Sequence, residues 1–314
     1  MEEAKVPGLS IAIIKDAKLD WRRGFGVKDA ASRKPVDDDT VFEAASMSKP
    51  VFAYAVMKLC ERGVMDLDTP LTRYTSERFL DGDPRLDLIT ARHVLSHTSG
   101  FQNWRSKADP LAIHFTPGEK YLYSGEGYSY LQSVVAHVTG QPIEPYMRAN
   151  LFTPFGMPSS GYLWNDTFQA RMARPHDAKG RPTDNRKSTA ADVARYGSSG
   201  ALLTTPTDYA RFVIEVIAPR PSDSFRLGKT SLEEMLRPQV KVDDGYSSSW
   251  ALGWKVLHTE KGDMISHGGD NPGFHCFTVA SRERKAGFVI MTKGESGGRL
   301  LNRLLLGNLL KRFL

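Results

Sequence analysis

Short apolar runs separated by polar breaks lie at both ends of the chain. Residues 9–14 form a run rich in isoleucine, residues 15–18 are mostly polar, and residues 19–26 form a second strand-like run. Two such runs joined by a short polar break predict a β-hairpin. The C-terminal third repeats the pattern, with four short apolar runs between charged or glycine-rich breaks, at residues 251–257, 264–266, 274–280 and 287–291.

The middle of the chain has a different pattern, in which apolar residues recur at the spacing of helices. Residues 171–189 are polar and aperiodic, which predicts a long surface loop, whereas the leucines of residues 299–314 predict an amphipathic closing helix. Loops rich in proline and glycine separate the four predicted helices of the middle, at residues 50–61, 90–96, 128–138 and 143–150.

Strands at both ends with helices between them predict an α+β fold. We expect one antiparallel sheet built from both chain ends and flanked by terminal helices, with an inserted, mostly helical lobe. The chain would be a single catalytic domain over residues 1–314, with a sheet lobe at about 1–45 and 200–314 and a helical lobe at about 46–199. A cleft between the lobes is where we expect a site.

Composition excludes several classes of protein. The 314 residues are 40% hydrophobic and 25% charged, which is ordinary for a globular chain, and no apolar run is long enough to span a membrane. The net charge of +6 is spread over scattered lysines and arginines, so we expect no nucleic-acid partner. Cys60 and Cys276 have no metal-ligand spacing, so we expect neither structural zinc nor another metal.

Location and assembly stay open at this point. Residues 1–6 contain no apolar segment typical of a signal peptide, so we expect a cytoplasmic protein, or a periplasmic or secreted one if a leader has been removed. No pattern in the sequence determines the oligomeric state.

Ser46 and Lys49 are the first chemical element, because they form the chain's one Ser-x-x-Lys. An apolar run follows Pro50, so the motif lies at a predicted helix start, where residues three apart share a face. A serine hydroxyl needs a base within reach, and a desolvated lysine can be neutral and act as that base. Ser46 would also gain from the amides and dipole of the helix N-terminus. The alternative is that Ser46 caps the helix and Lys49 lies on the surface.

Tyr123 and the segment from His267 to Asp270 are the second and third elements. Tyr123 precedes a Ser-Gly turn before a helix, where a phenol can face a cleft and carry a proton. In the third element, Gly268 and Gly269 allow close approach of the backbone to a ligand, and the Asp270 amide can pair with the Ser46 amide as an oxyanion hole. Taken singly, Tyr123 fits a packed core tyrosine and the third element fits a glycine-rich turn.

Other patterns favour no competing chemistry. His93 and His97 are four residues apart, but Val94 stands where a metalloprotease helix needs glutamate, so we expect structural or capping roles. The chain also lacks the Gly-x-Ser-x-Gly turn of α/β-hydrolases. Trp250 is a candidate wall of the site, with a core position as the alternative.

Together and in this order, the three elements resemble the Ser-x-x-Lys, Tyr-x-Asn and Lys-Thr-Gly signature of serine β-lactamases and penicillin-binding proteins. The nearer match is the branch similar to class C β-lactamases and class VIII esterases, which often carries His-x-Gly as the third element. Residues 41–46, 95–100 and 151–157 resemble the family too, and the resemblance extends from about Val6 to the final helix.

The resemblance implies roles at the matched positions. Ser46 would be the acylated nucleophile, and Lys49 and Tyr123 would take its proton and later activate water. His267 would hold the place of the third-motif lysine and support Tyr123 electrostatically. The amides of Ser46 and Asp270 would bind the oxyanion, and the reaction would need no cofactor and no metal.

Two departures from the signature bear on the substrate. Gly125 stands where the family usually has an asparagine that holds the substrate's amide, and Gly268 stands where β-lactamases have a hydroxyl that helps to bind the drug's carboxylate. We therefore expect a small ester or amide substrate and, most specifically, a class VIII-type carboxylesterase. The alternatives are a β-lactamase or D-alanyl carboxypeptidase acting on cell-wall-like amides, and a non-catalytic ligand-binding member of the family.

Overall fold

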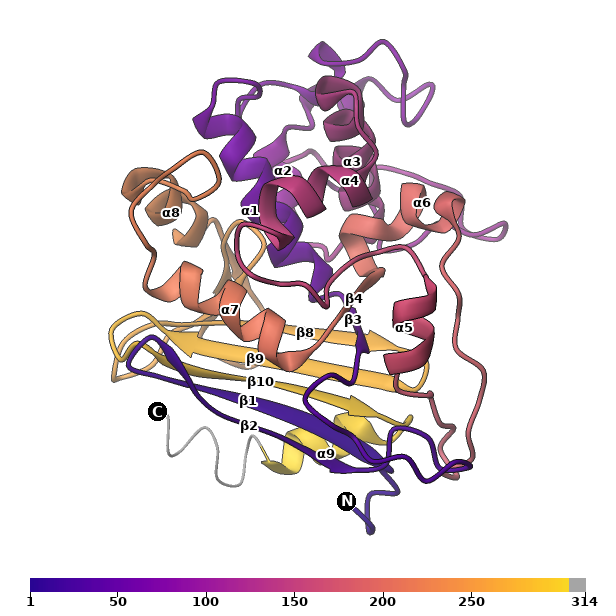
Figure 1. The fold of residues 1–314 in the computed structure, drawn as a ribbon. Helices are drawn as coiled ribbons and strands as arrows, with labels where there is room; N and C mark the ends of the chain where they lie inside the picture. Colours follow the sequence, from indigo (N-terminus) through magenta and orange to yellow (C-terminus); the bar gives the residue numbers. More distant parts are fainter. Residues whose placement is uncertain (305–314) are drawn as a thin grey trace.

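An eight-stranded antiparallel sheet is the base of the computed structural model, which describes residues 1–304 (Figure 1). Its order is β2-β1-β10-β9-β8-β7-β6-β5, so strands from the two ends of the chain pair in its middle. The α+β prediction with a large antiparallel sheet is thereby confirmed. The strands are β1 (Gly8–Lys15), β2 (Lys18–Gly26), β5 (Val240–Val242), β6 (Ser248–Trp250), β7 (Lys255–Leu257), β8 (Met264–Asn271), β9 (Phe274–Ser281) and β10 (Ala286–Lys293).

Alternation along β10 shows why the sheet is covered on both faces. Successive side chains of a strand point to opposite faces. Phe288 and Ile290 pack in a small cluster with Leu301 of α9 (Gly297–Leu304), whereas Val289 and Met291 belong to the main core. Figure 1 shows α9 on one face of the sheet and the other helices beyond the opposite face.

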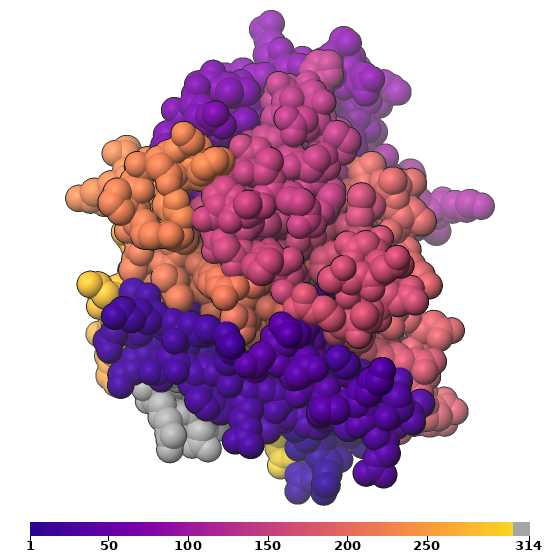
Figure 2. Space-filling model, in the orientation of Figure 1, coloured from indigo at the N-terminus to yellow at the C-terminus, as the bar shows by residue number. Residues whose placement is uncertain are grey.

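The helical region between β3 (Phe42–Ala45) and β4 (Leu202–Thr204) positions the site. These two short strands pair with each other, and α1 (Ser48–Glu61) follows β3 directly. Figure 2 shows the N-terminal residues, in indigo, as a band across the lower part of the molecule, with residues from the middle of the chain above them. The remaining helices are α2 (Ala91–Leu95), α3 (Gly125–Thr139), α4 (Ile143–Met147), α5 (Asp166–Arg171), α6 (Ala190–Gly200), α7 (Pro206–Ile217) and α8 (Lys229–Leu236), with short helical turns at Leu71–Arg73, Pro84–Leu88 and Arg148–Phe152.

Some predicted boundaries differ from the observed ones. The apolar run at residues 251–257 is not one strand, because residues 251–254 form a turn in which Gly253 has a φ of 85°. The segment at residues 171–189 is largely a loop, as predicted, and α6 begins directly after it. The predicted closing helix begins at Gly297, and its residues 305–314 lie outside the described residues. Among the described helices, none combines the length and the apolar composition that crossing a membrane requires.

Candidate active site

The turn between β3 and α1 presents Ser46. Ala45 has a φ of 48°, a left-handed conformation that is uncommon for a residue with a side chain. The hydroxyl of Ser48 donates to the Ala45 carbonyl at 2.6 Å and accepts from the Leu202 amide at 3.0 Å. These bonds hold the sharp turn against β4, so that Ser46 precedes the helix instead of lying within it.

Lys49 lies directly beneath the Ser46 hydroxyl. Its Nζ is 3.1 Å from Ser46 Oγ and donates to the Ser199 carbonyl at 2.7 Å. The side chain is fully buried, and Nζ lies 4.7 Å from the ring centre of Tyr123 and 5.5 Å from that of Tyr128. Burial without a carboxylate partner disfavours the ammonium form and lowers the pKa of Lys49 to about 7. A substantial fraction of this lysine is therefore a neutral amine near neutral pH.

The alternative in which Ser46 caps the helix and Lys49 lies on the surface is wrong. The residue at the helix N-cap is Met47, and no side chain caps the helix there. Lys49 is buried and not on the surface. Ser46 is therefore not the helix cap and Lys49 is not a surface residue, so those two structural roles do not explain the motif.

Tyr123 comes from the segment before α3 and completes the group. The Ser46 hydroxyl forms a side-chain hydrogen bond with its phenol, and burial raises the pKa of Tyr123 well above its ordinary value. The phenol therefore stays protonated at neutral pH in the free protein. Of Lys49 and Tyr123, only Lys49 therefore has a pKa at which a neutral, proton-accepting form is populated near neutral pH.

His97 holds Tyr123 in place, a role that sequence reasoning did not assign. Its ring lies 4.2 Å from the Tyr123 ring and 4.9 Å from Trp250, counted between ring centres. Its Nδ1 accepts the Ser124 amide at 3.0 Å, which fixes the residue that caps α3. His97 also has a left-handed φ of 57°, a backbone conformation that no local sequence pattern predicted.

His267 is present at the site but neutral. Burial, together with the nearby Lys49, lowers the pKa of His267 to about 3. Its Nδ1 lies 2.7 Å from the Gly268 carbonyl, and its ring centre is 5.5 Å from that of Trp250. Nδ1–H thus donates to the carbonyl, which leaves Nε2 as a buried acceptor. The expected electrostatic support for Tyr123 therefore cannot come from a charged imidazolium.

The end of β8 lies tightly against the nucleophile turn. A Cβ added to Gly269 would be 2.1 Å from the Ala44 carbonyl oxygen, so only glycine allows this approach. The side-chain amide of Asn271 donates to Glu43 at 2.7 Å, which ties β8 to β3. The Asp270 carboxylate is three-quarters exposed and bonds to His275. This packing brings the backbone of Asp270 beside the Ser46 turn.

A hollow of about 920 Å³ opens over these groups, and we call it the catalytic pocket. The predicted site residues that line it are Ser46, Tyr123, Trp250, His267, Gly268 and Asp270. Gly125 and Gly269 lie in the adjoining backbone. At Gly125 a Cβ would meet the Trp104 ring at 2.3 Å, so Trp104 occupies the space that a side chain there would need. Sequence reasoning also missed Trp104, because only the fold brings its loop to this position.

No group of described residues has the make-up of a metal site. His93 instead completes a capping box with Thr90 at the start of α2. Cys60 and Cys276 are both free thiols, and burial raises the pKa of each.

Comparison with known proteins identifies the family of this chain. The model of the β-lactamase family, described as "Beta-lactamase", matches residues 1–308. The chain belongs to the β-lactamase family, whose members are serine hydrolases that include esterases, β-lactamases and carboxypeptidases.

Curated relatives are distant. Penicillin-binding protein 4* of Bacillus subtilis is 24% identical over 309 residues, covering 88% of this chain and 65% of that protein. Esterase EstB of Burkholderia gladioli is 30% identical over 218 residues, covering 59% of this chain and 54% of the esterase. The chain thus spans about half to two-thirds of the length of these relatives.

Solved structures share the fold. The octameric penicillin-binding protein homologue from Pyrococcus abyssi has a TM-score of 0.82 at 24% identity, over 100% of this chain and 76% of that one. A β-lactamase/D-alanine carboxypeptidase from Pseudomonas syringae also has a TM-score of 0.82, at 20% identity, over 98% of this chain and 96% of that one.

Proposed function

We propose that this protein hydrolyses small carboxylic esters through an acyl-enzyme on Ser46. The observation that carries the proposal is the 3.1 Å approach of the buried Lys49 amine, whose pKa of about 7 leaves about half of it neutral near pH 7, to a serine hydroxyl in an open pocket. A binding protein has no use for a desolvated amine beside a hydroxyl, because burying that amine disfavours its charged form without serving the ligand.

Acylation starts with proton transfer from Ser46 Oγ to Lys49 Nζ as Oγ attacks the ester carbonyl carbon. The amides of Ser46 and Asp270 stabilise the oxyanion, at the positive end of α1. The bond from the carbonyl carbon to the leaving oxygen then breaks, and Tyr123 donates its phenolic proton to that oxygen. The alcohol thus departs with the Tyr123 proton, and the proton that Lys49 took from Ser46 passes to Tyr123, which restores both groups.

Deacylation repeats these steps with water in place of the serine. Neutral Lys49 takes a proton from the water, the hydroxyl attacks the acyl carbon, and Ser46 leaves with that proton. Three side-chain groups thus serve both halves of the reaction.

The pocket favours neutral esters over β-lactams and peptides. Gly125 and Gly268 offer no side-chain hydrogen bond to an amide or a carboxylate, and a Cβ at Gly268 would meet nothing closer than 3.8 Å. The likeness to an esterase among the relatives agrees with this preference.

A substrate panel tests the proposal. We expect the protein to hydrolyse 4-nitrophenyl acetate and butyrate, to open a chromogenic cephalosporin slowly if at all, and to spare a D-alanyl-D-alanine peptide. Ser46→Ala should lose the ester activity and the mass adduct that a fluorophosphonate probe leaves on the native protein. Efficient cephalosporin opening without ester hydrolysis would make it a β-lactamase. A probe adduct that persists in Ser46→Ala would remove Ser46 from the mechanism.

A further inference from the structure

Trp104 lies where a substituent of residue 125 would otherwise be. A Cβ on Gly125 would come within 2.3 Å of one atom of the indole ring and within 2.7 Å of two more. Contacts this short show that the ring packs directly on the backbone at the start of α3. Trp104 is nevertheless 41% exposed, so part of the ring faces open space.

The loop that carries Trp104 is fastened on both sides of it. The Asn103 side chain accepts the Gly125 amide at 2.9 Å, and its carbonyl accepts the Glu126 amide at 3.0 Å. Arg105 donates twice to the buried Glu126 carboxylate, at 2.9 and 2.7 Å. A residue held between two such neighbours keeps one position, as a rigid wall requires.

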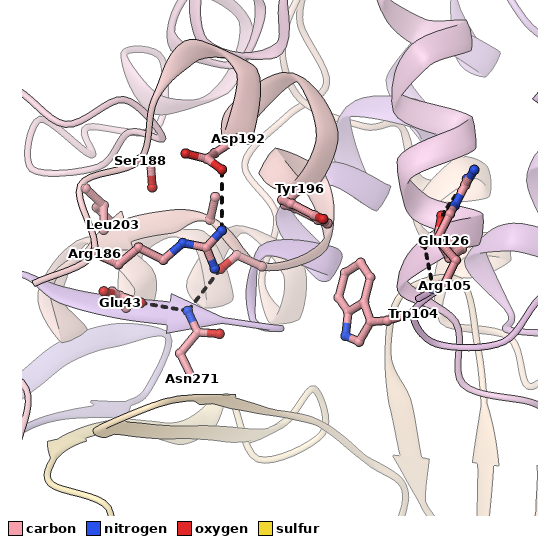
Figure 3. Close-up of a pocket in the computed structure, with 12 residues that line it drawn as sticks. Glu43, Trp104, Arg105, Glu126, Arg186, Ser188, Asp192, Tyr196, Leu203 and Asn271 are labelled. Atoms are coloured by element: carbon pink, nitrogen blue, oxygen red, sulfur yellow. Dashed lines mark hydrogen bonds and ion pairs between the residues drawn. The ribbon is translucent and has the colours of Figure 1, made fainter. Parts of the chain in front are cut away.

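A second hollow of about 290 Å³, which we call the side pocket, lies on the other side of this wall. Trp104, Gly200 and Asn271 line both hollows, so the two share a boundary. Figure 3 shows the Trp104 ring between the Arg105–Glu126 pair and the group of polar side chains around Asn271. The side pocket is walled further by Glu43, Arg186, Asp192, Tyr196 and Leu203.

The position of the side pocket indicates which half of the substrate it would receive. The leaving group must lie near Tyr123, which protonates it, and neither Tyr123 nor Trp250 lines the side pocket. The side pocket borders Asn271 and Glu43 instead, next to the Asp270 backbone and on the β3 side of Ser46. It therefore lies on the side of the carbonyl from which the acyl chain extends.

We propose that Trp104 is a specificity-determining residue that separates the catalytic pocket from the side pocket and so restricts the enzyme to esters of short acyl chains. The proposal rests on the proposed ester hydrolysis. Removal of the ring would join the two hollows and admit a longer acyl group, whereas a smaller aromatic ring would keep most of the wall.

The test is a series of 4-nitrophenyl esters, from acetate to octanoate, with Trp104→Ala and Trp104→Phe. We expect Trp104→Ala to raise the octanoate-to-acetate ratio of kcat/KM by about tenfold or more, which is the scale on which a pocket discriminates by size. Trp104→Phe should stay within about threefold of the native ratio. Trp21→Ala is the matched control, because Trp21 is equally exposed at 42% but lies on β2, the far edge strand.

A second series keeps the acetyl group and enlarges the alcohol from nitrophenyl to naphthyl. The proposal would be overturned if folded Trp104→Ala kept the native octanoate-to-acetate ratio of kcat/KM. It would also be overturned if kcat/KM rose only for esters of the larger alcohol. If Trp104→Ala does not fold, Trp104→Leu replaces it. We then expect a smaller rise in the octanoate-to-acetate ratio, and an unchanged ratio would again contradict the proposal. Hydrolysis of 4-nitrophenyl acetate by the native protein separates this failure from a failure of the ester-hydrolase proposal, in which the native protein would hydrolyse no ester of the series.

Discussion

Two lysines of the described residues 1–304 are fully buried, and they differ in what they touch. Lys49 lies at the start of α1 and Lys293 at the end of β10, and burial lowers the pKa of each to about 7. Lys49 Nζ lies 3.1 Å from a serine hydroxyl that lines the catalytic pocket. Lys293 Nζ lies 3.4 Å from Nδ1 of the buried His176.

The difference shows that a lowered pKa does not by itself identify a catalytic group. Both lysines meet the electrostatic requirement of a general base, but only Lys49 is within reach of a hydroxyl that a substrate can approach. Asp29 and Arg174 also act on Lys293, with opposite signs. The geometry around the amine therefore decides which lysine serves chemistry.

Replacement of each lysine by methionine should give the largest contrast. Lys49→Met removes the base, and we expect kcat for a nitrophenyl ester to fall by roughly 10²–10⁴-fold, the scale of a lost acid–base group. Lys293→Met should stay within about threefold of native activity, because it leaves Ser46 and its neighbours unchanged. Equal losses in both folded variants would mean that the lysines act through the fold and not through proton transfer.

Tyr123 and Tyr162 offer a second contrast, with an expected loss of activity nearly as large. Tyr123→Phe removes the proton donor to the leaving group, so we expect a loss of about 10²–10³-fold with a poor leaving group such as an alkyl alcohol. The loss should be smaller with nitrophenol, which leaves without a proton. Tyr162→Phe is the control, because Tyr162 is a fully buried tyrosine that does not line the pocket. A loss in Tyr123→Phe that is independent of the leaving group would contradict a donor role.

His97 should have a smaller effect, since it acts through Tyr123. His97→Ala removes the ring packed against Tyr123 and the acceptor of the Ser124 amide. We expect kcat to fall about tenfold with little change in KM, and part of the activity to return in His97→Asn, whose side-chain oxygen can accept the same amide. A rise in KM alone would show that His97 shapes substrate binding instead.

The smallest effect concerns stability, in which the two lysines should behave alike. An amine with a pKa near 7 when folded and near 10.5 when unfolded destabilises the protein fully below pH 7, and this cost disappears as the pH rises to about 10.5. Both methionine variants should therefore gain stability over the native protein at pH 6 and lose that gain by about pH 10. Urea unfolding at the two pH values measures it, and a gain in only one variant would show that folding does not lower the pKa of the other amine.

Much of the fold and the central chemistry could be predicted from the sequence, because they depend on local patterns. The apolar runs of β1 and β10 and the Ser-x-x-Lys before an apolar helix are visible along the chain. The turn at Gly253 interrupts an apolar run that reads as one strand, because a left-handed turn leaves no apolar signal. The strands β4, β5 and β6 and the helices α7 and α8, all between residues 202 and 250, were not predicted.

The partners of the site residues could not be predicted, because they come from distant segments. Ser199 contributes a backbone carbonyl to Lys49, and any residue type supplies one. Trp104 reaches Gly125 because Asn103 and Arg105, on either side of it, bond to the start of α3. The neutrality of His267 depends on its burial beside Lys49, which no local pattern encodes.

The most direct test of the central claim is the rate at which a fluorophosphonate acylates Ser46 as a function of pH, read by intact mass. Since neutral Lys49 is the base, the rate should rise with pH through a midpoint near 7 and then level off. Lys293→Met should keep that profile, and Lys49→Met should lose it together with most of the rate. A rate that does not change between about pH 5 and 9, or a native profile in Lys49→Met, would contradict the claim that this lysine activates the serine.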